Sequence, residues 1–143
     1  MAIETPPLMP KQMVRYREDP VLFLQEQYVV RDIRSGKDRL VKLEPFQVKI
    51  LRDVLCTRGA DGLRQYNLAL LGMGKKNGKS ELASMVAVWH VYCDEREAEV
   101  YVVANDLEQS ASVTFKRIAR AIRKNPRLAR EANVGKYEIT IPA

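Results

Sequence analysis

The sequence predicts an α/β fold in which helices flank a parallel sheet. Two apolar runs, residues 66–71 and 99–104, have the near-continuous apolar composition of strands that are covered on both faces. A segment with apolar residues at helical spacing follows each run. Strands that alternate with helices in this way typically form a parallel sheet with right-handed crossovers.

Before residue 66 the sequence predicts an arm, two helices and two loops. In chain order these are residues 1–19 (irregular arm), 20–30 (helix), 31–42 (loop or short hairpin), 45–57 (helix) and 59–62 (loop). Three prolines, Pro6, Pro7 and Pro10, make the arm irregular. The first helix has Asp19 as its predicted N-cap, and both helices have proline in their first turn. We expect residues 20–143 to form part of one domain.

From residue 66 onward the predicted pattern is strand, helix, strand, helix, strand. These elements are residues 66–71, 81–93, 99–104, 107–124 and 137–141. The first helix places its apolar residues on one face for packing, and the second has Asn105 or Asp106 as N-cap and basic residues in its last turn. Pro126 follows the end of that second helix.

A glycine-rich loop joins the first strand to its helix. Residues 72–80 read GMGKKNGKS and end in Gly-Lys-Ser. Strand, loop and helix in this order hold nucleotide phosphates in P-loop NTPases, because backbone N–H groups and the helix N-terminus both attract anions. Lys79 is therefore expected to reach the β- and γ-phosphates of ATP, and the Ser80 hydroxyl to ligate Mg²⁺.

The loop departs from the usual pattern G-x-x-x-x-G-K-[ST] at one position. That pattern places its first glycine at residue 73, where this chain has Met73. Gly72 and Gly74 flank this position and keep positive φ angles available one residue away. The alternative interpretation is a strand-to-helix turn in which glycine and lysine serve turn geometry and solubility.

Composition limits the classes of function. A chain of 143 residues suits one domain. Its net charge of +6 slightly favours a polyanionic partner, either nucleotide or nucleic acid, over a solvated basic surface. No apolar stretch is long enough to span a membrane. Cys56 and Cys93 lack metal-ligand spacing and are expected to be reduced and buried in helices. His90 is the only histidine, which disfavours a catalytic triad or a histidine-based zinc site.

A cluster of basic residues in the last predicted helix has two interpretations. They recur at helical spacing and could meet DNA phosphates, but a solvated helix face is the more common role of such a pattern. The residues are Lys116, Arg117, Arg120, Arg123, Lys124 and Arg127.

Three segments, in order, resemble the large terminase subunit of tailed bacteriophages. Residues 75–83 (KKNGKSELA) resemble its phosphate-binding loop, and residues 43–47 (LEPFQ) resemble its adenine-recognition segment. Residues 99–104 (EVYVVA), followed by Asp106 and Gln109, resemble the next strand and helix. The likeness runs from about residue 20 onward and implies the N-terminal portion of an ATPase domain that drives the packaging of viral double-stranded DNA.

The resemblance implies a role for individual residues. Gln47 is expected to hydrogen-bond the adenine edge, with a solvent-facing helix residue as the alternative. Lys79 neutralises the phosphates, and Ser80 holds Mg²⁺. Lys75 lies in the region where relatives often carry a catalytic arginine, and a lysine lacks the bidentate fork of that arginine. The residues expected to wrap the phosphates are Gly74, Lys76, Asn77 and Gly78.

The resemblance also implies partners that this chain alone does not specify. These are double-stranded DNA, a portal protein, a small terminase subunit and further copies in a homo-oligomeric ring, all in the host cytoplasm. The family's acidic strand, which supplies the catalytic carboxylate, and its nuclease domain are expected beyond residue 143. Asp106 is better explained as a helix cap than as that carboxylate.

Without that acid we expect weak nucleotide binding, little hydrolysis, and marginal stability or association of the isolated chain. The alternatives are a non-catalytic nucleotide- or DNA-binding module, a prophage relic that keeps the loop, or another P-loop ATPase.

Overall fold

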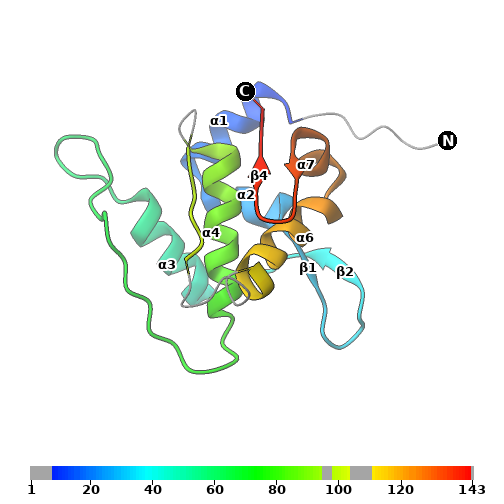
Figure 1. The fold of residues 1–143 in the computed structure, drawn as a ribbon. Helices are drawn as coiled ribbons and strands as arrows, with labels where there is room; N and C mark the ends of the chain where they lie inside the picture. The colour runs from blue at the N-terminus through cyan, green and yellow to red at the C-terminus, as the bar shows by residue number, and fades with distance from the viewer. Residues whose placement is uncertain (1–7, 95–97, 104–110, 143) are drawn as a thin grey trace.

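The computed structural model describes residues 8–94, 98–103 and 111–142 (Figure 1). It contains helices and two small antiparallel sheets. The elements in chain order are α1 (Pro10–Glu18), α2 (Pro20–Gln27), β1 (Val29–Arg31), β2 (Asp38–Leu40), α3 (Pro45–Cys56), α4 (Lys79–Cys93), η1 (Ala111–Phe115, a π-helical turn), α6 (Lys116–Lys124), α7 (Pro126–Glu131), β3 (Asn133–Val134) and β4 (Ile139–Thr140). No helix in these described ranges is both long and apolar enough to cross a membrane.

Helix α4 lies at the centre of the molecule and is buried on several sides (Figure 1). Its buried residues do not keep to one stripe, as expected for a helix surrounded by other elements. Helices α1, α2 and α6 all contact it. The buried residues of α4 are Leu82, Ser84, Met85, Ala87, Val88, Trp89, Tyr92 and Cys93.

The predicted helices formed close to their expected bounds. Asp19 accepts hydrogen bonds from the N–H groups of Val21 and Leu22 at 3.1 and 3.2 Å, so it caps α2 as expected. Helices α3 and α4 also begin within two residues of the predicted positions. The second predicted helix is described from residue 111 and ends at Lys124, so its proposed caps at 105 and 106 lie outside the described residues.

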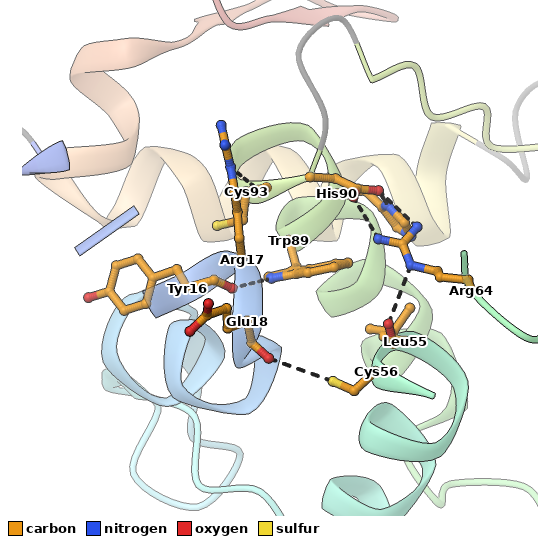
Figure 2. Close-up of polar contacts among 10 residues, drawn as sticks. Tyr16, Arg17, Glu18, Leu55, Cys56, Arg64, Trp89, His90 and Cys93 are labelled. Carbon is orange, nitrogen blue, oxygen red and sulfur yellow. Dashed lines mark hydrogen bonds and ion pairs between the residues drawn. The ribbon is translucent and has the colours of Figure 1, made fainter. Parts of the chain in front are cut away.

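The expectation of an irregular arm over residues 1–19 is wrong for residues 10–18, which form α1. Pro10 occupies the first turn, where its missing N–H is no disadvantage. Tertiary packing then stabilises this short helix, because Tyr16 is buried and its carbonyl accepts a hydrogen bond of 2.7 Å from Nε1 of Trp89 (Figure 2). Residues 1–7 lie outside the described part of the chain.

Buried polar side chains tie α2 to the junction between α6 and α7. The Asn125 amide donates to the carbonyl and side-chain oxygens of Gln27 at 2.7 and 3.0 Å. Gln27 in turn donates to the Tyr16 hydroxyl at 3.0 Å. Every buried side-chain polar atom in the described residues has a partner, which is what a well-specified core requires.

A hairpin, one of the two forms predicted for residues 31–42, begins earlier than expected. The helix predicted over residues 20–30 ends at Gln27, and Val29 and Val30 form strand β1. Strands β1 and β2 pair antiparallel, with Val30 opposite Arg39. Asp32 accepts hydrogen bonds from the backbone of Ser35 and from the Arg39 side chain, and these contacts lower the pKa of its carboxyl to about 2.

The parallel sheet is the part of the prediction that the described residues do not contain. Residues 66–71 and 99–103 have no regular secondary structure, and the expected strand at 137–141 is reduced to β4, which pairs antiparallel with β3. Residue 104 lies outside the described part. The sequence of residues 66–71 suits a strand that is covered on both faces, but no described strand lies beside it to complete the ladder.

Both apolar runs are consequently exposed to solvent. Leu68 and Leu70 are 76% and 90% exposed, and Tyr101 and Val103 are 77% and 87% exposed. In Figure 1 the segment from α3 to α4 sweeps away from the helices. Few residues in or near these runs contact the core. Val102, within the second run, and Met73, just after the first, are partly buried against it. An exposed apolar segment of this kind favours association.

We predict that replacing Leu68 and Leu70 by serine reduces self-association without loss of stability. Both side chains are exposed, so the free energy of unfolding should change by less than about 0.5 kcal/mol. Light scattering after size exclusion measures the association, and thermal melting measures the stability. Leu128→Ser is the buried control and should destabilise the fold by about 3 kcal/mol. An unchanged apparent mass in the double variant would contradict this prediction.

Candidate nucleotide-binding site

The glycine-rich loop ends in a tight turn directly before α4. Lys76 and Gly78 have φ angles of 66° and 78°, both in the left-handed region. Gly78 adopts this conformation without steric cost, whereas Lys76 is a non-glycine residue held in a sparsely populated region. The chain then enters α4 at Lys79, and the first helical hydrogen bond runs from the Leu82 N–H to the Gly78 carbonyl at 2.8 Å.

The first turn of α4 is left open to an anion. Gly78 is the N-cap residue and offers no side chain to it. Within the described residues, the N–H groups of Lys79, Ser80 and Glu81 have no acceptor. Unpaired N–H groups at a helix N-terminus, together with the helix dipole, attract negative charge. The turn is therefore suited to phosphate oxygens, and the left-handed Gly78 brings the main chain close to them.

The structure brings most of the predicted residues together around this turn. The Asn77 amide approaches Gly74 so closely that a Cβ added there would lie 3.2 Å from Nδ2. Ser80 and Gly78 are half-buried, whereas the residues with the long or amide side chains lie exposed at the surface. These exposed residues are Lys75, Lys76, Asn77 and Lys79.

Gln47 reaches the same turn from α3. Its Nε2 would lie 3.5 Å from a Cβ added to Gly78. Its Oε1 accepts a hydrogen bond of 2.9 Å from the Glu44 N–H in a capping box, which fixes the side chain at the start of α3. Gln47 is half-buried, between the capping contact at Glu44 and the turn at Gly78. Thirty residues lie between Gln47 and Gly78 in the sequence, and the fold brings the two together.

Glu81 fixes the start of α4, a role that the sequence did not indicate. Its two carboxylate oxygens accept hydrogen bonds of 2.7 Å each, one from the Tyr28 hydroxyl and one from the Arg117 guanidinium. Tyr28 is fully buried, and burial together with the charge of Glu81 raises the pKa of its hydroxyl, which therefore remains a donor. The residue after Ser80 is thus held by Tyr28, which caps the end of α2, and by Arg117 in α6.

A cavity of about 490 Å³ lies against this anchor. The hairpin of β1 and β2 forms one wall, and Glu81, Arg117 and Arg120 contribute the other. It therefore adjoins the first turn of α4 and contains both cationic and anionic side chains.

The basic residues of α6 mostly pair within the chain. Arg117 bonds Glu81, while Arg120 and Lys124 both contact Asp38 at the end of the hairpin. Arg123 donates to the carbonyl of Val134 at 3.2 Å. These contacts favour a structural role for the α6 cations over the DNA contact that their spacing also allowed.

The opposite end of α4 carries a second polar cluster (Figure 2). Arg64 donates two hydrogen bonds to the Asp94 carboxylate, at 2.6 and 3.0 Å, and one to the Leu55 carbonyl at 3.3 Å. His90 contacts the same carboxylate, so its role is structural, as expected. The Arg64 guanidinium also lies 5.3 Å from the Trp89 ring centre, in cation–π geometry.

Both cysteines are free and lie in helices, Cys56 half-buried in α3 and Cys93 buried in α4. Burial raises the pKa of each thiol above its ordinary value, which keeps both protonated and poorly nucleophilic.

We predict that the Arg64–Asp94 pair stabilises the fold in a pH-dependent way. Burial alone would raise the pKa of Asp94, but hydrogen bonds from Arg64 and the neighbouring His90 hold it below the ordinary 3.8. Because the folded-state pKa is the lower one, the stabilisation is present above pH 3.8 and is lost as the pH falls through the folded-state value. Asp94→Asn should cost about 1–3 kcal/mol at neutral pH.

The measurement is thermal melting of both proteins as a function of pH. The difference between parent and Asp94→Asn should narrow as the pH drops below 3.8. Asp61→Asn is a matched control, because Asp61 is exposed and accepts only a backbone hydrogen bond in its own loop. A difference that stays constant with pH would contradict the assignment.

Comparison with known proteins gives two matches. A sequence model of the terminase large subunit ATPase domain matches residues 45–143, which is more than half of the chain. The crystal structure of the HK97 bacteriophage large terminase is similar, with a TM-score of 0.60 and 21% sequence identity. That match covers 83% of this chain and 23% of the other, so it shows a shared fold over less than a quarter of the HK97 protein. No curated protein matches.

Proposed function

Because this chain belongs to the family of terminase large subunits, by its match to their ATPase domain, we propose that it supplies the ATP-binding part of a DNA-packaging motor. The observation that supports this most directly is the open first turn of α4. Its N–H groups have no acceptor in the described residues, directly after the left-handed Gly78. An anion of high charge, such as a triphosphate, satisfies these donors.

Each loop residue has a distinct role in this proposal. The main chain from Gly74 to Gly78, with Lys76 and Asn77, surrounds the phosphates. Lys79 neutralises their charge as a point cation, and the Ser80 hydroxyl ligates Mg²⁺. Mg²⁺ held by Ser80 would offset the negative charge of the phosphates. Gln47 offers an amide N–H to the adenine, since its Oε1 already accepts the Glu44 N–H.

Glu81 contributes by orientation. Its hydrogen bonds to Tyr28 and Arg117 fix the direction of the first turn of α4, on which Lys79 and Ser80 stand. Lys75 lies on the exposed side of the turn and is proposed to assist phosphoryl transfer as a second cation.

We also propose that residues 66–71 and 99–104 are strands of a parallel sheet that is complete only in a longer protein. Their apolar composition and exposure support this, since burial against neighbouring strands would remove those side chains from water. To that longer protein we assign the catalytic acid, translocation of double-stranded DNA, the portal and small-subunit partners, ring assembly and action in the host cytoplasm.

We predict that Lys79→Ala weakens the binding of Mg²⁺-ATP by at least about tenfold, because the phosphates lose a charge-assisted hydrogen bond. Equilibrium fluorescence with a labelled ATP analogue measures the affinity. Lys42→Ala is the matched control, because Lys42 is an exposed lysine outside the loop and should leave the affinity unchanged. Equal affinities of Lys79→Ala and the parent would refute the proposed phosphate site.

Lys75→Ala tests whether Lys75 contributes to the binding of the nucleotide. We expect the affinity for Mg²⁺-ATP to change by less than about threefold, because Lys75 is exposed and its charge is screened by water. Phosphate release should be near background for both the parent and Lys75→Ala, since the catalytic acid is expected outside these residues. A steady turnover that Lys79→Ala abolishes would show that the acid is within these residues.

A further inference from the structure

We propose that a second anion site, specific for a phosphate group, lies at the C-terminal end of α4, at the end of the helix opposite the glycine-rich loop. A cavity of about 370 Å³ is found there, and arginines dominate its charged lining. The residues that line it are Arg17, Arg58, Leu63, Arg64, Cys93 and Asp94.

Three separate parts of the chain converge on this cavity. Arg17 comes from α1, Arg58 and Arg64 from the loop that follows α3, and Asp94 from the end of α4. Figure 2 shows the Arg17 and Arg64 side chains around the last turn of α4, with Trp89 and His90 between them. Among the described residues of this lining, three guanidinium groups against one carboxylate leave an excess of two positive charges.

The two loop arginines face each other across a local antiparallel bridge. Arg58 pairs with Arg64, and hydrogen bonds of 2.8 Å from the Gly59 N–H to the Leu63 carbonyl and 3.0 Å from the Gln65 N–H to the Thr57 carbonyl hold the loop closed. Directly opposite residues project to the same side, so two like charges here repel each other. Asp94 compensates Arg64, while no carboxylate in the described residues pairs with Arg58.

Arg17 adds a second cation that is only partly engaged. Its Nε donates to the Cys93 carbonyl at 3.0 Å, which covers one of the last carbonyls of α4 and offsets the negative end of the helix dipole. The terminal nitrogens of its guanidinium have no acceptor in the described residues. Arg17 and Arg58 both line the cavity, and guanidinium forks match phosphate oxygens, so a phosphate group bound there would offset their positive charge.

This arrangement differs from that of the other basic surface. The α6 arginines already bond Glu81, Asp38 and a main-chain carbonyl, so they gain less from an added anion. The cavity is larger than one phosphate needs and is open to solvent on the side of exposed Arg17 and Arg58, which suits a phosphate that is part of a nucleic-acid backbone as well as a free one.

Arg58→Gln tests the site, because its side chain bonds no other described residue and its loss should leave the fold intact. The first probe is a short, fluorescently labelled DNA duplex, whose affinity is followed by anisotropy over a range of salt concentrations. We expect Arg58→Gln to weaken the duplex affinity about tenfold and to lower the salt dependence by about one released ion. Arg34→Gln, an exposed arginine in the β1–β2 turn, is the matched control and should bind like the parent.

The second probe is inorganic phosphate, compared with chloride at equal ionic strength in thermal melts. If Arg58→Gln removes a phosphate-dependent rise in melting temperature but leaves the duplex affinity unchanged, the site is assigned to free phosphate. Loss of duplex binding assigns it to the nucleic-acid backbone. If Arg58→Gln and Arg34→Gln behave alike with both probes, the proposal is overturned. Because inorganic phosphate also suits the glycine-rich loop, the melts are repeated in the Lys79→Ala background. There a phosphate-dependent rise that Arg58→Gln removes should persist, so failure of the nucleotide site is distinguishable from failure of this one.

Discussion

Burial of α4 is the constraint on which the rest of this structure depends. The helix is apolar around most of its circumference and is surrounded by α1, α2 and α6, so its position is fixed by side-chain packing. Trp89 combines packing with hydrogen bonding, since its ring is buried and its N–H donates to the Tyr16 carbonyl in α1. A helix held in this way presents its two ends at defined places, and each end carries a polar site.

The two ends of α4 are stabilised by different means. At its start, the anchor is Glu81, and the preceding turn is left without a side-chain cap. At its end, side chains from other elements satisfy the helix, with Arg17 on a terminal carbonyl and Arg64 on Asp94. An uncapped N-terminus costs stability unless a ligand supplies the acceptor, whereas a capped C-terminus does not need one. The N-terminal turn of α4 therefore lacks an acceptor from within the described residues, whereas the C-terminal turn has its capping contacts from them.

The exposed apolar segments place a second condition on the fold. Residues 66–71 precede the glycine-rich loop, so their positions and that of the loop are linked through the chain. In the described residues they make no sheet, and the left-handed turn at residues 76–78 is formed without one. The local geometry of the turn therefore comes from Gly78, the start of α4 and the neighbouring Gln47, and the strand that precedes it in the sequence is not needed to form it.

Much of the helical structure and most of the candidate nucleotide site could be predicted from the sequence. Asp19 before a proline, the capping residues of α3 and the Gly-Lys-Ser at the start of α4 are local signals, because each acts on backbone groups within one helical turn. A role for Gln47 at the nucleotide site was expected only through the family resemblance, and the α1 helix was hidden by the prolines at and before its start.

What the sequence by itself determined is therefore where helices begin and which loop presents an uncapped N-terminus. Only the tertiary structure decided that Glu81 bonds Tyr28 and Arg117, that the α6 cations bond acids of the same chain, and that Arg17, Arg58 and Arg64 share one cavity. The physical reason is distance along the chain. Helix caps and turns are local, whereas ion pairs, buried networks and sheets depend on partners that folding brings in from elsewhere.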